Sequence, residues 1–166
     1  MSRAFRAAAL AACLLSAAIV AADEVVLRVS GAVDTPLELT RADLDAMPRD
    51  EFRIPTQHDR SVMETWAGVP MIEILRKAGA PVGERLRGPN MAGYVVVIAE
   101  DGFRAVYALA EIEPRFSPER RILVADRLDG EPLGDKFGNL RIANQGEGAF
   151  SRWVRKVVAL EVRLAD

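Results

Sequence analysis

The chain offers few side chains whose type and spacing could carry out chemistry, and the first group lies in the middle of the sequence. Gln57-His58-Asp59-Arg60 contains the only histidine. An imidazole beside a carboxylate and a guanidinium could exchange protons or bind an anion. The same four residues also suit a solvent-exposed loop with an incidental ion pair. His58 and Arg60 are therefore candidate binding residues for a ligand or cofactor, with a plain loop as the alternative.

A second candidate site lies nearer the C-terminal end. Residues 144–148 read Asn-Gln-Gly-Glu-Gly, a polar and glycine-rich run directly after a predicted strand. Backbone amides in such a run can hold a small anion or a polar ligand, and Arg152 adds a positive charge a few residues later. Asn144, Gln145 and Arg152 are therefore further candidates for binding a ligand or cofactor. A flexible connection is the alternative.

Several classes of function lack support in the sequence. None of the motifs G-x-S-x-G, H-E-x-x-H or G-x-x-x-x-G-K occurs, and no residue can be assigned a catalytic role. A lone histidine with scattered carboxylates has no recognisable ligand spacing, so we expect no metal site. A formal charge of −2 with both signs interspersed argues against nucleic-acid binding. We expect Trp66 and Trp153 to pack in the core rather than to line a site.

The elements that must position these residues are short strands and a few helices. Thr40 and Asp43 can cap a short helix that ends before Pro48, and Pro70 and Gly79 bound the clearest helix. Alternating or β-rich runs predict the strands, and the dipeptide at 101–102 is expected to supply two positive-φ residues of a tight hairpin turn. The fold class expected is α+β, with short, mostly antiparallel strands and two or three short helices. The predicted strands lie at 25–29, 37–39, 51–57, 94–99, 103–109, 122–125, 140–143 and 160–164.

The first 22 residues have the order of a secretory signal peptide. Arg3 and Arg6 precede an apolar, alanine-rich run over residues 7–21, and acidic residues follow Ala22. Cleavage after Ala22 would leave residues 23–166 as one domain, which we expect in the periplasm. No later apolar run is long enough for a membrane-spanning helix, so no transmembrane segment is expected in the mature chain.

The same region has a second interpretation. Leu10-Ala11-Ala12-Cys13 fits a lipoprotein cleavage box, in which lipidation of Cys13 would anchor the protein to a membrane. We favour the signal peptide because the apolar run continues past Cys13. Cys13 is the only cysteine of the chain, so cleavage after Ala22 would leave neither a disulfide nor a thiolate ligand.

A series of motifs then runs along most of the chain. Residues 66–79 read W-A-G-V-P-M-I-E-I-L-R-K-A-G, and D-G-F follows at 101–103. I-L-V-A and G-E-P-L come next, within 122–133, and G-N-L-R at 138–141 precedes R-W-V-R-K-V at 152–157. In this order the segments are similar to motifs of the sulfite-oxidase-type molybdopterin-binding domain, and the chain resembles that family of oxidoreductases.

The resemblance implies a mixed α/β domain that holds a pterin dithiolene, whose molybdenum is also bound by one cysteine thiolate, and that performs two-electron or oxygen-atom-transfer chemistry. In this sequence Thr56 is the nearest counterpart of that cysteine. A threonine hydroxyl is a hard donor that does not replace a soft thiolate. Glu147 stands where the family carries positive charge for the pterin phosphate, which leaves Arg152 as the anchor.

These observations lead to one expected function and two alternatives. We expect an oxidoreductase-like protein without thiolate-bound molybdenum, which binds a small ligand or another exported protein in the cofactor cleft. Molybdopterin is possible by resemblance, and no cofactor is the expectation. The first alternative is an active molybdopterin-dependent oxidoreductase acting on a small oxyanion or oxide, with His58 or Arg60 against the substrate. The second is a pure protein-interaction module, which would have a closed cleft.

Overall fold

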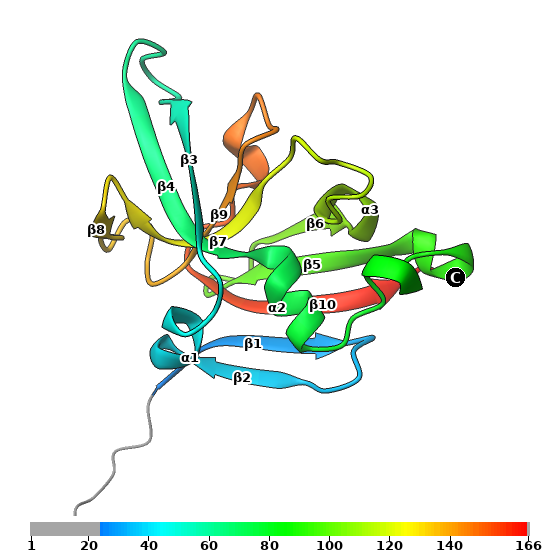
Figure 1. Cartoon of the computed structure of the whole chain (residues 1–166). Helices are drawn as coiled ribbons and strands as arrows, with labels where there is room; N and C mark the ends of the chain where they lie inside the picture. Colours follow the sequence, from blue (N-terminus) through cyan, green and yellow to red (C-terminus); the bar gives the residue numbers. More distant parts are fainter. Residues whose placement is uncertain (1–23, 166) are drawn as a thin grey trace, which may run out of the picture.

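Residues 24–165 are described by a computed structural model and form two β-sheets with three short α-helices (Figure 1). The α+β class with mostly antiparallel strands is confirmed. The predictions for residues 1–22 lie outside the described residues. Within 24–165, no helix is long and apolar enough to cross a membrane. The strands are β1 (Val25–Gly31), β2 (Leu37–Thr40), β3 (Asp50–Pro55), β4 (Met63–Pro70), β5 (Gly93–Ala99), β6 (Arg104–Ala108), β7 (Ile122–Leu128), β8 (Glu131–Pro132), β9 (Arg141–Asn144) and β10 (Val157–Leu164).

The first sheet has the strand order β2-β1-β10-β5-β6. Its central strand is β10, which runs parallel to β1 and antiparallel to β5. The first and last described strands of the chain therefore lie side by side (Figure 1). Strand β10 lies in the middle of the sheet. The segment that leads into it, residues 145–156, therefore contacts both sheets.

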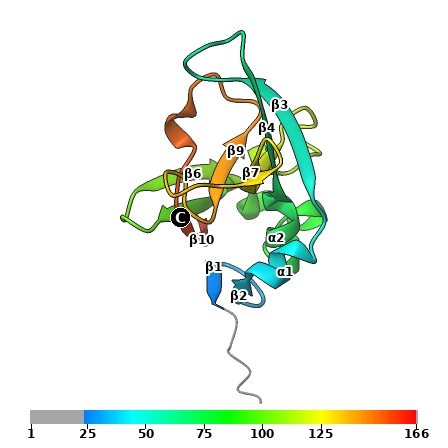
Figure 2. The same cartoon turned by 90° about the vertical axis from the view of Figure 1, so that its left-hand side faces the viewer.

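The second sheet has the order β3-β4-β7-β8, with β9 also paired to β7, and every pair is antiparallel. Strands β3 and β4, joined by residues 56–62, form a long hairpin that we call the arm. In Figures 1 and 2 the tip of the arm and the orange segment around residues 145–152 rise on the same side of the molecule. Side chains from the tip of the arm and from that segment line one pocket, which is described below.

The helices begin where the sequence predicts them. Helix α1 (Arg41–Asp45) has the capping box: the Thr40 hydroxyl accepts from the Asp43 amide at 3.2 Å, and the Asp43 carboxylate accepts from the Thr40 amide at 2.9 Å. Helix α2 (Met71–Lys77) starts directly after Pro70. Helix α3 (Leu109–Ile112) takes over where the sequence predicted the last residue of a strand, because the Glu111 carboxylate accepts from the Ala108 amide and ends β6.

The hairpin predicted around residues 101–102 is confirmed as the β5–β6 pair, but the predicted turn type is wrong. Only Gly102 has a positive φ, of 85°, and Asp101 instead accepts from the Phe103 amide at 2.9 Å. Two consecutive positive φ angles occur at Asp129 and Gly130, between β7 and β8. There the connection has two residues, which is the length that demands this geometry.

The buried side chains form two clusters. The larger one packs the first sheet against α2 and the segments around it. The smaller one belongs to the second sheet and is aromatic, with Phe52, Trp66 and Trp153 at its centre. Trp66 is 1% exposed and Trp153 is 3% exposed, so both pack in the core as expected, but Trp153 also lines the pocket described below, which the sequence did not lead us to expect. This aromatic cluster forms the floor of the site described next.

Candidate functional site

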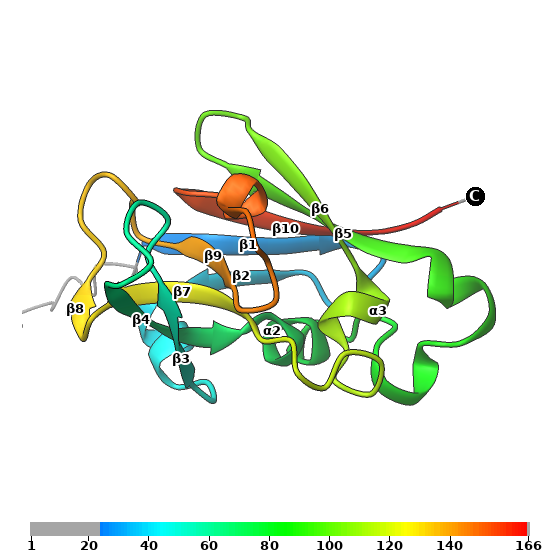
Figure 3. The same cartoon turned by 90° about the horizontal axis from the view of Figure 1, so that it is seen from above.

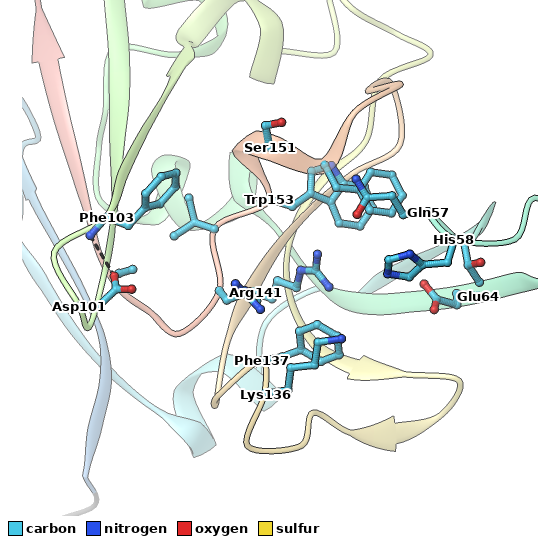
Figure 4. A pocket seen from close by; sticks show the side chains of 15 residues that line it. Gln57, His58, Glu64, Asp101, Phe103, Lys136, Phe137, Arg141, Ser151 and Trp153 are labelled. Carbon is cyan, nitrogen blue, oxygen red and sulfur yellow. Dashed lines mark hydrogen bonds between the residues drawn. The ribbon is translucent and has the colours of Figure 1, made fainter.

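A pocket of about 540 Å³ lies between the arm, β9 and the turn of the β5–β6 hairpin (Figure 4). Its lining is more polar than apolar and includes the charged side chains Glu64, Asp101, Lys136, Arg141 and Arg155 together with His58. Aromatic side chains from the smaller core cluster, such as Phe137 and Trp153, complete the wall. The pocket therefore combines cations with flat apolar surfaces.

Arg141 is the central side chain of the pocket. It is 8% exposed, and its guanidinium carbon lies 4.7 Å from the ring centre of Trp66, 4.5 Å from that of Phe137 and 5.3 Å from that of Trp153. Cation–π attraction to three rings holds it in place. Its Nε has no hydrogen-bond partner among the described residues.

The electrostatics of Arg141 follow from this position. Burial lowers the pKa of Arg141 to about 10, and the positive charge of Arg155 acts in the same direction, while Glu64 opposes both. No carboxylate of the described residues lies within ion-pair distance of the Arg141 guanidinium. Arg141 is thus a nearly buried cation without a counterion of its own.

The backbone explains why two arginines meet here. All four residues of β9 are buried, and its first residue, Arg141, pairs with Ala125 of β7 on one side. On the other side Arg141 forms an isolated antiparallel bridge with Arg155. Residues directly opposite in such a bridge project their side chains to the same face. Two positive charges are therefore placed next to each other at the pocket, an arrangement that is unfavourable without an anion.

The arm contributes His58 to the pocket. Its ring points into the pocket and lies near Glu64, as Figure 4 shows. Thr56 also lines the pocket, but its hydroxyl is engaged in the turn: it donates to the Asp59 carbonyl at 2.8 Å and accepts from the Asp59 amide at 3.0 Å. Arg60, at the tip of the arm, is exposed and does not line the pocket.

The predicted residues Asn144 and Gln145 lie outside the lining of the pocket. Asn144 is fully buried, and its Oδ1 accepts from the Gly146 amide at 3.1 Å, which closes the turn of this loop. Its Nδ2 and the Oε1 of Gln145 have no hydrogen-bond partner in the described part of the chain. The Asn144 side chain therefore stabilises the turn of this loop from within.

Arg152 is held by acidic groups on the far side of the same loop. Its guanidinium donates to Glu111 at 3.0 Å, pairs with Glu147 and lies 4.5 Å above the ring of Tyr107. The hydrogen bond to Glu111 raises the pKa of Arg152, burial opposes this effect, and the hydrogen bond to Glu147 adds to it. The Tyr107 hydroxyl donates to the Arg152 carbonyl, so the segment after residue 144 is fixed against β6, as Figure 3 lets the reader follow.

Of the five residues predicted to bind a ligand or cofactor, only one lines the pocket. His58 lines it, whereas Arg60, Asn144, Gln145 and Arg152 do not, and a binding role for each of them stays a prediction. Sequence reasoning missed Arg141, Arg155 and Lys136. A signal for Arg141 was present: an arginine interrupts, at its second position, the otherwise apolar run Leu140 to Ala143 that was predicted to be a strand.

The lining does not fit a molybdenum ion held by a thiolate. Its donors are nitrogen and oxygen atoms, and the only cysteine, Cys13, lies outside the described residues. Soft thiolates, not hydroxyls or carboxylates, are the ligands that suit such a centre. Among residues 24–165, no group of three or more histidine, cysteine, aspartate or glutamate side chains could hold a metal ion.

The chain is a small α+β domain with a pocket that is lined from both sheets. The family model described as "Oxidoreductase molybdopterin binding domain" matches residues 15–164, so the chain belongs to this family, and the resemblance seen in the sequence is confirmed. No match is found among curated protein sequences.

A solved structure shares the fold. The crystal structure of the sulfane dehydrogenase SoxCD from Paracoccus pantotrophus is similar with a TM-score of 0.62 and 19% sequence identity. The match covers 82% of this chain and 37% of that chain, so this protein spans little more than a third of the length of the SoxCD chain. At this identity the similarity concerns the fold alone.

Proposed function

We propose that this protein is an exported member of the molybdopterin-binding-domain family that binds a small ligand in the Arg141 pocket and holds no molybdenum through a thiolate. The observation that carries the proposal is the buried Arg141 guanidinium, which lines an open pocket without a carboxylate partner. A buried charge without a partner is costly, and a bound anion would supply that partner.

The absence of thiolate-held molybdenum is proposed from the donors that the chain offers. Thr56 is the nearest counterpart of the family's cysteine, and its hydroxyl is already hydrogen-bonded within the turn of the arm. Cys13 is removed if the first 22 residues act as a signal peptide. Export to the periplasm rests on that same sequence pattern.

An active molybdopterin enzyme is the second candidate, and membership of the family favours it. It would need a ligand for molybdenum other than cysteine and another anchor for the pterin phosphate, because Arg152 is already paired with Glu111 and Glu147. A pure interaction module, which predicts a closed cleft, has less support because the pocket is open.

The test is elemental and pterin analysis of the full-length protein, expressed in a molybdopterin-competent host and purified from the periplasm, with native mass spectrometry alongside. A cysteine-containing member of the family, expressed in the same host, is the positive control for cofactor loading. We expect the mass of a mature chain that begins at Asp23. We expect neither molybdenum nor pterin in stoichiometric amounts. One molybdenum and one pterin per chain would contradict the proposal and establish the enzyme.

A further inference from the structure

The charge of the pocket restricts what can bind in it. Lys136, Arg141 and Arg155 carry three positive charges, while Glu64 and Asp101 carry two negative charges. Not counting His58, the lining therefore has a formal excess of one positive charge. A ligand with one negative charge neutralises this excess, whereas a phosphate monoester carries nearly two negative charges at neutral pH.

The donor groups fit a planar anion. Arg141 and Arg155 lie opposite each other in an antiparallel bridge, so both guanidinium groups face the same side. The Nε of Arg141 has no partner among the described residues. Arginine presents parallel N–H groups that match the two oxygens of a carboxylate. A carboxylate between these two side chains would also screen their mutual repulsion.

The size and the walls of the pocket call for a ligand with an organic body. The volume of about 540 Å³ is far more than a small inorganic anion fills and lies within the range of pockets for organic ligands. Phe103 lines the pocket and is 51% exposed, and Phe150 lines it with one face stacked on Trp153 at 4.1 Å. An apolar group on the ligand would cover surface that these rings now present to water.

We infer that the pocket binds an organic monocarboxylate, whose carboxylate group lies between Arg141 and Arg155 and whose apolar body packs against Phe103 and Phe150. This inference rests on the proposed function, because it names the class of ligand for the same pocket. It requires no bond to be made or broken, so the protein acts as a binding module for such acids.

The experiment measures binding through tryptophan fluorescence. Trp66 and Trp153 are the only tryptophans, and both contact Arg141, so the emission reports on this pocket. The probes are phenylacetate, its neutral amide phenylacetamide, phenyl phosphate and acetate. We expect saturable binding of phenylacetate and no binding of the amide. Phenyl phosphate carries nearly two negative charges, and acetate has no apolar body. Each should bind about tenfold more weakly than phenylacetate, which corresponds to the loss of one modest interaction.

Variants test the two arginines. Arg141→Gln and Arg155→Gln should each raise the dissociation constant of phenylacetate about tenfold or more, because each removes a charge-assisted hydrogen bond. Arg155 is exposed, so its variant keeps the test valid if the buried Arg141 variant does not fold. Arg53→Gln, an exposed arginine outside the pocket, is the matched control and should bind like the unchanged protein.

The possible failures are distinguishable. Molybdenum and pterin in the purified protein would overturn the proposed function, whatever the probes do. In protein without cofactor, tighter binding of phenyl phosphate, equal binding of the amide, or no binding of any probe would overturn the assignment of a monocarboxylate.

Discussion

Arg141 lies with its guanidinium 4.7 Å from the ring of Trp66, in contact with aromatic side chains and without a carboxylate partner among residues 24–165. Burial lowers its pKa to about 10, which means that the folded protein disfavours its charge. Three cation–π contacts offset part of this cost. We expect the desolvation cost to exceed this gain in the ligand-free protein, because binding residues are often retained at a cost in stability.

The first prediction follows from this balance. Arg141→Met, which keeps much of the volume and removes the charge, should raise the free energy of unfolding of the ligand-free protein by about 1 kcal/mol, since apolar replacement of buried charges is often stabilising. The measurement is urea denaturation at pH 7. Arg53→Met is the control and should be close to neutral, because Arg53 is exposed. A loss of stability in Arg141→Met would show that the contacts with the rings outweigh desolvation.

The pKa of Arg141 also gives the direction of a pH effect. The folded-state pKa, about 10, is below the ordinary value of an arginine side chain. The unfolded chain therefore binds more protons than the folded chain between these two values, and stability gains from this group as the pH rises through that window. Below pH 10 the Arg141 side chain is charged in the folded protein, so the full free-energy cost of burying this charge is present. Because the cost is absent from Arg141→Met, the stability difference between the variant and the unchanged protein should be constant from pH 6 to pH 9, measured by urea denaturation.

The Arg152 cluster, formed by Arg152, Glu111 and Glu147, should have the opposite role. Arg152 pairs with both carboxylates and donates to the Val106 carbonyl at 2.8 Å. Arg152→Leu should lower the free energy of unfolding by about 2 kcal/mol, because it leaves the partly buried Glu147 carboxylate without its partner and leaves Glu111 paired with Arg120 alone. Hydrogen exchange should speed up in residues 145–152 before the rest of the chain. Arg121→Leu, which breaks an exposed pair with Asp50, is the control and should cost less than about 1 kcal/mol.

Local patterns in the sequence predicted local structure well, and long-range contacts explain what was missed. The capping box joins Thr40 and Asp43, three residues apart, so one short motif contains both partners. Arg152 looked free to anchor an anion because Glu111, its main partner, is 41 residues away in sequence. No local pattern reveals such a pairing.

The pocket was missed for a similar physical reason. Its cations come from β9, from the segment before β10 and from the loop after β8, and only the pairing of strands brings Arg141 beside Arg155. The family motif did place an arginine at the start of the last short strand, and the fold it implies is confirmed. The motif could not show which carboxylate pairs with each arginine. That pairing decides whether an arginine forms an ion pair within the protein or remains available to bind a ligand.

The capping box gives a prediction for acid conditions. Hydrogen bonds from the Thr40 amide and hydroxyl lower the pKa of Asp43 below its ordinary 3.8. The stability from the ionised carboxylate is therefore present above the unfolded-state value and lost as the pH falls through the folded-state value. Asp43→Ala should lower the thermal midpoint at pH 7, and the difference from the unchanged protein should shrink below pH 4. Asp135→Ala, at an exposed aspartate in the loop after β8, is the control and should leave the thermal midpoint at pH 7 nearly unchanged.

Gly68, in strand β4 of the second sheet, should not tolerate a larger side chain. It lies in β4 opposite Ala125 of β7, where a bulge shifts the register, and a Cβ added there would lie 2.2 Å from the Val124 carbonyl oxygen. Backbone cannot move aside without separating the two strands, so Gly68→Ala should cost about 3 kcal/mol or more, or prevent folding. Gly134→Ala is the matched control, since a Cβ there meets no atom within 4 Å and the backbone does not have a positive φ. Thermal unfolding of both variants, followed by circular dichroism, checks this: equal midpoints would mean that β4 and β7 are not packed as closely as described.

Because Trp66, two residues before Gly68 in β4, belongs to the floor of the Arg141 pocket, a folded Gly68→Ala should also bind phenylacetate more weakly than Gly134→Ala does.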